Sequence, residues 1–112
     1  MIIIWYNPRC TKSRQTLALI EDRDPKVVKY LEIPPTEAEI RATLATLDIP
    51  AIKLMRTGEK TFKDLGLSKT DDEQTLITAM AQNPILIERP IVFANGKAAI
   101  GRPPETVLAL FD

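Results

Sequence analysis

Blocks of apolar residues near the N-terminus predict a strand, a helix and a second strand. Residues Met1–Tyr6 form an apolar run with the length of a buried strand, and Ser13–Ile20 has the length and composition of a helix. After a break at Arg23–Pro25, the run Val27–Leu31 predicts another strand. A strand, a helix and a strand of these lengths predict a right-handed βαβ unit with parallel strands.

Two pairs of polar residues mark expected helix starts in the middle of the chain. Thr36 and Glu39 have the spacing of a capping box, which predicts a helix over about Glu37–Leu47. Thr70 and Glu73 repeat that spacing before a second apolar periodic segment. We therefore expect a helix to begin after each threonine.

Shorter helical segments are expected between these two helices, over residues 50–55 and 62–67. Asn83-Pro84 should end the last helix of the series, because proline cannot continue it. We interpret residues of about 36–83 as a helical insertion between the second and third strands, packed beside the sheet. The 112 residues are then expected to form one domain.

Strand character returns toward the C-terminus. The runs Ile85–Ile87 and Ile91–Ala94 predict strands, and Asn95-Gly96 predicts a tight hairpin with Lys97–Ile100 as its return strand. A last helix is expected over Thr106–Phe111. The predicted fold class is α/β, with a small mixed four-stranded sheet flanked by helices.

Composition narrows the range of functions. The chain has 15 basic and 15 acidic residues, which argues against general nucleic-acid or membrane binding, and no apolar run is long enough to span a bilayer. It contains no histidine and one cysteine, so we expect no metal site. A single cysteine cannot form an intramolecular disulfide, which favours a reducing, cytoplasmic location.

That single cysteine, Cys10, lies where the first strand leads into the first helix. The N-terminus of a helix favours an anion, and Arg9, Lys12 and Arg14 add positive charge nearby. A cysteine so placed can have a pKa of about 3.5–7.5. The alternative is a small buried apolar side chain, but three cations within four residues favour a reactive thiolate.

Together these motifs make the chain similar to the glutaredoxin-dependent arsenate reductase family, which has a thioredoxin-like fold. The resemblance covers essentially the whole chain. It rests on four motifs: Asn7–Arg14, Leu54-Met55-Arg56, Pro84–Val92 and Gly101-Arg102-Pro103. The whole Pro84–Val92 block makes the resemblance far more specific than the cysteine motif alone.

The resemblance implies roles for particular residues. Cys10 would be the nucleophile, and an oxyanion pocket would be formed by Arg56, Arg89 and Arg102. Pro90 would be the cis-proline that faces the cysteine in this fold. The substrate would be arsenate or a similar oxyanion, with glutathione as co-substrate, glutaredoxin as partner and no bound cofactor.

The chain departs from the better-known members of this family just before Asn-Pro. They carry a histidine there, whereas this chain has Tyr6, which brings no positive charge at neutral pH. Stabilisation of the Cys10 thiolate would then fall to the helix end and to Arg14.

Oxyanion binding and thiolate attack are also supported by the types of the candidate residues, without the family resemblance. Arginine presents a planar fork that binds oxyanions bidentately, and several cations offset the repulsion between a thiolate and an anionic substrate. Each arginine could instead be a solvated or salt-bridged surface side chain, and Pro90 an ordinary edge-strand proline. Ser13, one turn after Cys10, cannot act as a resolving thiol. Its hydroxyl could bind the thiolate or simply belong to the first helical turn.

Three functions remain open on the sequence alone. The first is a thiol-dependent arsenate reductase coupled to glutathione and glutaredoxin. The second is a glutathione-linked thiol oxidoreductase with another substrate. The third is a non-catalytic regulator resembling Spx, which binds RNA polymerase.

Overall fold

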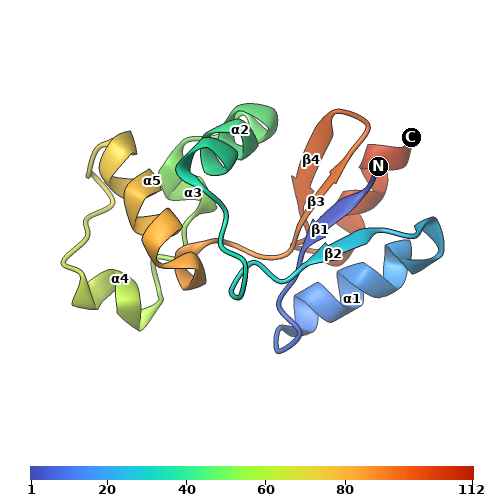
Figure 1. Cartoon of the computed structure of the whole chain (residues 1–112), viewed down its shortest axis with the longest axis horizontal. Coiled ribbons are helices and arrows are strands. Elements are labelled where there is room, and N and C mark those ends of the chain that lie inside the picture. Colours follow the sequence, from blue (N-terminus) through green and yellow to red (C-terminus); the bar gives the residue numbers. More distant parts are fainter. The chain divides into compact units, whose positions relative to one another are not determined.

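The computed structural model describes residues 1–112, and their contacts divide the chain into two compact units (Figure 1). The first unit contains Met1–Ile33 and Arg89–Asp112, and the second contains Pro34–Glu88. The second unit corresponds closely to the predicted helical insertion. The expectation that all 112 residues form one domain stays a prediction.

A four-stranded mixed sheet forms the centre of the first unit, in the order β2-β1-β3-β4. The strands are β1 (Ile3–Trp5), β2 (Lys26–Val28), β3 (Ile91–Ala94) and β4 (Lys97–Ile100). β1 pairs in parallel with β2 and antiparallel with β3, and β3 pairs antiparallel with β4. The predicted parallel unit and mixed sheet are therefore confirmed.

The hairpin between β3 and β4 turns at Asn95-Gly96, as predicted. Both residues have positive φ angles, 54° at Asn95 and 72° at Gly96, which a two-residue turn of type I′ requires. The Asn95 side chain also donates a hydrogen bond of 2.9 Å to the carbonyl oxygen of Leu110. The turn is thereby attached to the C-terminal helix.

Helices pack on the sheet of the first unit. They are α1 (Thr11–Ile20), which is followed by the short 3₁₀ turn η1 (Glu21–Arg23), and the 3₁₀ helix η3 (Pro104–Phe111). α1 and η3 contact each other, and they share a core cluster with the two central strands. The buried members of this cluster are Ile4, Ile20, Val92, Ala94, Val107 and Leu110. The helix expected over Thr106–Phe111 is present, but it is of the 3₁₀ type and begins at Pro104.

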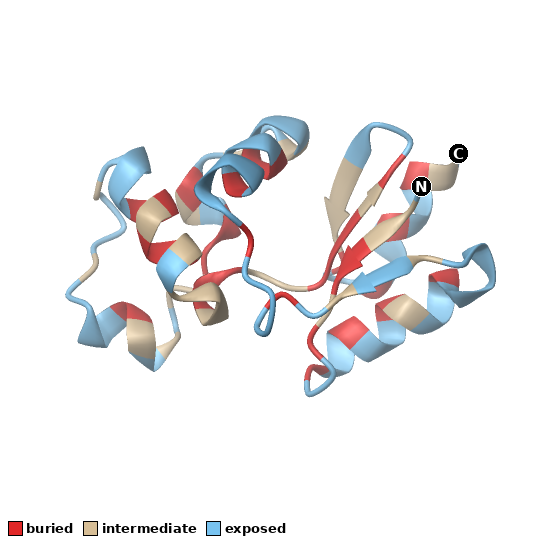
Figure 2. Cartoon of the chain, in the orientation of Figure 1, coloured by how far each residue is buried: buried red, intermediate tan, exposed pale blue.

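The second unit is helical. It contains α2 (Glu37–Leu47), α3 (Ala51–Leu54), α4 (Lys60–Asp64), α5 (Glu73–Gln82) and the 3₁₀ turn η2 (Pro84–Leu86). The capping box at Thr36 and Glu39 is confirmed, because each side chain accepts a hydrogen bond from the other residue's backbone N–H. Figure 2 shows that α2 and α5 are buried along one side, and Ile40, Leu76 and Met80 there are almost fully buried.

Two local predictions are wrong. Asp72, not Thr70, caps α5, and its carboxylate accepts a hydrogen bond of 2.8 Å from the N–H of Thr75. Residues Ile85–Ile87 do not form a strand, because Pro84 begins a 3₁₀ turn and Ile87 makes only an isolated bridge with Met55. As expected, none of the helices has the length and apolar character that a bilayer crossing needs.

Candidate active site

The loop between β1 and α1 is built by Asn7. Its side-chain oxygen accepts a hydrogen bond of 3.0 Å from the N–H of Arg9, and its carbonyl oxygen accepts one of 3.0 Å from the N–H of Cys10. Its own N–H donates to the hydroxyl of Ser13 at 3.3 Å. Asn7 is only 6% exposed, so these bonds fix the loop from within the protein.

This loop places Cys10 immediately before α1, which begins at Thr11. Cys10 is the N-cap residue, with extended backbone angles, and its side chain is 8% exposed. The thiol makes no regular capping hydrogen bond. Instead, several hydrogen-bond donors around the sulfur stabilise the thiolate.

Those donors lower the pKa of Cys10 to about 7, from an ordinary value of 9.0. Burial is the largest single influence and acts in the opposite direction, because it disfavours the charged thiolate. The backbone N–H and hydroxyl of Ser13, the guanidinium of Arg89 and the backbone N–H of Lys12 together outweigh it. At neutral pH about half of the molecules therefore carry a thiolate.

Two arginines from the C-terminal part of the first unit lie at the sulfur. Nη2 of Arg102 is 3.6 Å from Sγ of Cys10, and Nε of Arg102 donates to the carbonyl oxygen of Arg89 at 2.8 Å. Arg89, which is half-buried, lowers the thiol pKa, whereas Arg102 is not among the groups that do so. In the sequence, Arg102 lies 13 positions after Arg89 and 92 positions after Cys10.

Gly101, the residue before Arg102, is tightly packed against Thr16 and Pro90. A Cβ atom on Gly101 would lie 2.5 Å from Oγ1 of Thr16 and 2.8 Å from Cγ of Pro90, so only glycine fits there. The N–H of Gly101 donates to the carbonyl oxygen of Pro90 at 2.9 Å. The peptide bond before Pro90 is cis, as the resemblance implies, and the bond before Pro103 is cis as well.

Arg14 lies on α1 but does not donate to the sulfur. Its guanidinium donates to the carbonyl oxygen of Pro8 at 2.8 Å and approaches the hydroxyl of Thr11 at 3.3 Å. The side chain thus braces the loop that presents Cys10. Arg14 is not among the groups that lower the pKa of Cys10, and its expected part in stabilising the thiolate stays a prediction.

Arg56 lies in the second unit and is held by carboxylates. Its guanidinium is 3.4 Å from Glu59 and 3.8 Å from Glu88, and its backbone N–H donates to the carbonyl oxygen of Leu86 at 2.7 Å. Arg56 is therefore a salt-bridged side chain in the structure, which is the alternative that the sequence left open. Its role as an oxyanion ligand stays a prediction.

Tyr6 packs on the core of the first unit. Its side chain contacts the cluster formed by the sheet, α1 and η3 and does not contribute to the pKa shift of Cys10. This position agrees with the apolar run Met1–Tyr6, which predicted a buried strand. No group of three or more histidine, cysteine, aspartate or glutamate side chains comes together to hold a metal ion.

The arrangement supports one kind of chemistry. A thiol with a pKa of about 7 lies beside two guanidinium groups, and Ser13 occupies the position one turn further along α1. A thiolate so placed can attack a molecule that the arginines attract, namely an anion. Since Cys10 is the only cysteine, a second thiol must come from another molecule.

Comparison with known proteins gives close matches over nearly the whole chain. The model of the ArsC family matches residues 5–110. An arsenate reductase of Neisseria meningitidis is 44% identical, and the match covers 97% of both chains. An uncharacterised protein of Escherichia coli, YfgD, is 50% identical over 96% of this chain and 93% of its own length.

A solved structure agrees with these matches. The structure of an arsenate reductase from Vibrio cholerae superposes with a TM-score of 0.93 at 43% identity, covering 97% of this chain and 96% of that chain. The thioredoxin-like fold expected from the sequence is therefore confirmed.

Proposed function

Because the chain belongs to the ArsC family, we propose that it is an oxidoreductase that reduces arsenate to arsenite through Cys10. The observation that supports this most directly is the Cys10 thiol, with its pKa of about 7, beside the guanidinium groups of Arg89 and Arg102. Those groups are suited to a tetrahedral oxyanion.

In the first step the Cys10 thiolate attacks the arsenic atom of bound arsenate. An As–O bond breaks and its oxygen leaves as water after protonation, so that a Cys10–arsenate thioester forms. Thiolate and substrate are both anionic, and their repulsion at about 4 Å is roughly 1 kcal/mol in water and larger in a cleft. Arg89 and Arg102 offset this repulsion.

In the second step a glutathione thiolate attacks the sulfur of Cys10. The S–As bond breaks, its electron pair moves to arsenic, and arsenite leaves. Cys10 is then joined to glutathione in a disulfide, and glutaredoxin restores the thiol by exchange. Ser13 cannot perform this step, which makes the external thiol necessary.

The remaining predicted residues act around this centre. We propose that Ser13 holds the thiolate through its hydroxyl and that Arg14 keeps the loop in place through Pro8. Pro90 supports Gly101 at the turn before Arg102. Arg56 would have to exchange a carboxylate partner for an oxyanion in order to bind substrate.

The test is an arsenate-dependent oxidation of NADPH, coupled through glutathione, glutaredoxin and glutathione reductase. The parent protein should support turnover, and Cys10→Ser should abolish it. Sulfate or phosphate should compete with arsenate, because each presents the same tetrahedral oxygens.

Activity in the Cys10→Ser variant would refute the proposed nucleophile. Reduction of a small disulfide without any arsenate turnover would favour the glutathione-linked oxidoreductase instead. If neither reaction occurs, the non-catalytic regulator becomes the better interpretation.

A further inference from the structure

Three cationic side chains flank Cys10 in the sequence, and no carboxylate of the protein pairs with them. They are Arg9, Lys12 and Arg14, which we call the basic rim; all three are exposed, and none forms an ion pair. Their charged groups are not among those that lower the pKa of Cys10, to which Lys12 contributes only its backbone N–H. The proposed chemistry therefore leaves the charge of the rim unused.

The basic rim lies at an end of α1 where cations are unfavourable. Lys12 and Arg14 are the second and fourth residues of α1, and its first turn contains no acidic residue. The N-terminus of a helix carries a partial positive charge, which stabilises acidic side chains and destabilises basic ones. The stability of the helix therefore does not explain why basic residues occur here.

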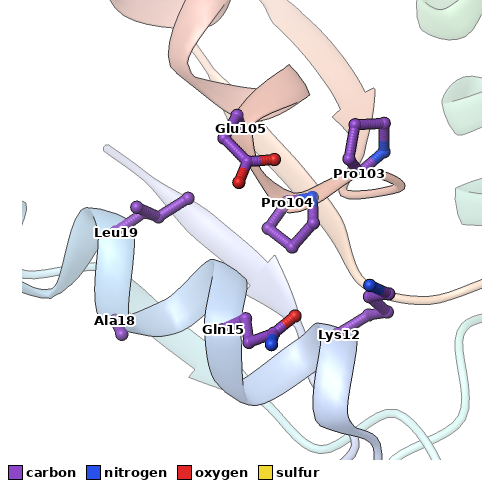
Figure 3. Close-up of a pocket in the computed structure, with 7 residues that line it drawn as sticks. All are labelled: Lys12, Gln15, Ala18, Leu19, Pro103, Pro104 and Glu105. Atoms are coloured by element: carbon purple, nitrogen blue, oxygen red, sulfur yellow. The ribbon is translucent and has the colours of Figure 1, made fainter.

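The opposite end of α1 is acidic. Glu21 is its C-cap residue and Asp22 follows, both are exposed, and the last turn contains no basic residue. The exposed residues of the middle are uncharged, and Figure 3 shows Gln15, Ala18 and Leu19 there. Both ends of the helix thus carry the charge that its dipole disfavours. A separation of charge in this direction guides an anionic partner to the Cys10 end.

The rim is spread too widely for one small anion. Successive residues of a helix turn by about 100°, so Lys12 and Arg14 project from nearly opposite sides of α1. Lys12 lies on the side of Pro103 and Pro104 (Figure 3), whereas the guanidinium of Arg14 donates to the carbonyl oxygen of Pro8. A small oxyanion cannot bridge side chains placed in this way, but a broad acidic surface can contact both.

A protein that exchanges thiols with Cys10 would cover these residues. Since Cys10 is the only cysteine, a mixed disulfide formed on it can be opened only by an external thiol. Cys10 is 8% exposed, and the residues on either side of it are exposed. A protein thiol that reaches the bonded sulfur therefore brings its own surface over the rim.

We propose that the basic rim is the docking surface for the protein that reduces the mixed disulfide on Cys10, and that this partner carries an acidic surface around its own thiol. Under the proposed function, on which this inference rests, the partner is a glutaredoxin. Its thiolate attacks the glutathione sulfur, the S–S bond breaks, and Cys10 leaves as a thiolate with the electron pair. The partner is then joined to glutathione in a disulfide.

The test starts from the Cys10–glutathione disulfide, which is prepared with oxidised glutathione and requires no arsenate. Its reduction is followed by mass, once with glutaredoxin and once with 2-mercaptoethanol. The second thiol is small and uncharged, so it needs no docking surface. The ratio of the two rate constants reports docking, because a change in how readily Cys10 leaves affects both reactions.

Lys12→Glu should lower this ratio about three- to ten-fold at low salt, because a repulsion replaces an attraction. The double variant Arg9→Glu/Lys12→Glu should lower it further, and both effects should shrink as salt is added. The unfolding midpoint of Lys12→Glu in denaturant should not fall, because an acidic residue suits the first turn of a helix. A loss of stability therefore cannot account for the slower reduction.

Lys26→Glu is the matched control. Lys26 is an exposed lysine of the same unit, and it pairs with Ile3 at the start of β1, whereas Cys10 follows the end of that strand. The substitution changes the net charge by the same amount and should leave the ratio near that of the parent. An equal fall in Lys12→Glu and Lys26→Glu would overturn the proposal, because net charge alone would explain it.

Three further outcomes are decisive. A parent protein that lacks arsenate turnover but shows the rim-dependent ratio refutes the proposed function while supporting the docking surface. An unchanged ratio in the double variant overturns the docking surface, whatever the arsenate activity. If Lys12→Glu keeps the parent ratio but loses retention on immobilised double-stranded DNA, the rim is a nucleic-acid surface and the proposed partner is wrong.

Discussion

Replacing Ser13 with alanine should raise the pKa of Cys10 by about one pH unit. The Ser13 hydroxyl accepts the N–H of Asn7 at 3.3 Å and uses its own proton toward the sulfur, so alanine removes a donor to the thiolate. A hydrogen bond to a charged group contributes about 1.5–3 kcal/mol, and one pH unit corresponds to about 1.4 kcal/mol. Because sulfur is a weak acceptor, we take the lower end of that range.

The change in reactivity at pH 7 should be much smaller than the change in pKa. The thiolate fraction of Cys10 falls from about one half to about one tenth when its pKa rises from about 7 by about one unit. A more basic thiolate is, however, about three-fold more nucleophilic, because the Brønsted coefficient is about 0.4–0.5. Alkylation at pH 7 should therefore slow only about two-fold.

The decisive assay is the ultraviolet absorbance of the thiolate as a function of pH. Arg14→Gln serves as the control, because it removes a nearby cation whose guanidinium contacts Pro8 and Thr11 but not the sulfur. Its midpoint should stay close to that of the parent. An unchanged midpoint in Ser13→Ala, or an equal shift in both variants, would refute the reasoning that hydrogen bonding at Ser13 stabilises the thiolate.

Other predictions concern stability and the arginines. Gly101→Ala should destabilise the fold by about 1–3 kcal/mol in denaturant unfolding, because the added methyl overlaps two buried neighbours. Tyr6→Phe should leave the thiolate midpoint unchanged, since the hydroxyl does not contribute to it. Arg89→Lys keeps the charge but loses the fork, so kcat/KM for arsenate should fall about ten- to hundred-fold; parent kinetics would contradict an oxyanion role. The folded Cys10 thiol deprotonates at about pH 7 and the unfolded one at 9.0, so unfolding free energy should rise over that interval in the parent relative to Cys10→Ser.

The strands and the first capped helix were predictable because their signals are local. The short apolar runs, the Asn95-Gly96 turn and the Thr36–Glu39 capping box are each signals within a few residues. The parallel pairing of β1 and β2 follows from the length of the intervening helix. These elements could therefore be predicted without knowing which distant residues they contact.

The wrong predictions arose where neighbouring residues compete for one role. Thr70 and Asp72 can each cap a helix, and only the true first turn of α5 selects Asp72. A three-residue apolar run such as Ile85–Ile87 suits a strand or a turn equally. Here Pro84 fixes the backbone at the start of a 3₁₀ turn.

The site was only partly predictable for a related reason. Cys10 and Ser13 lie on one helical turn, so their proximity follows from spacing. The approach of Arg102 to Cys10 joins residues 92 positions apart, and only the family resemblance indicated it. The structural role of Asn7 was missed, although an asparagine two residues before a backbone donor is a known turn signal.

The lone thiol also determines how the protein withstands oxidants. A thiolate attacked by peroxide becomes a sulfenic acid, which a second cysteine in the same chain can normally capture as a disulfide. Here the residue one turn away is Ser13, whose hydroxyl offers no such rescue. When external thiol runs short, the sulfenic acid of Cys10 can therefore be oxidised further and irreversibly to the sulfinic acid. Under the proposed mechanism, the supply of external thiol thus sets both the rate of turnover and the working lifetime of the protein.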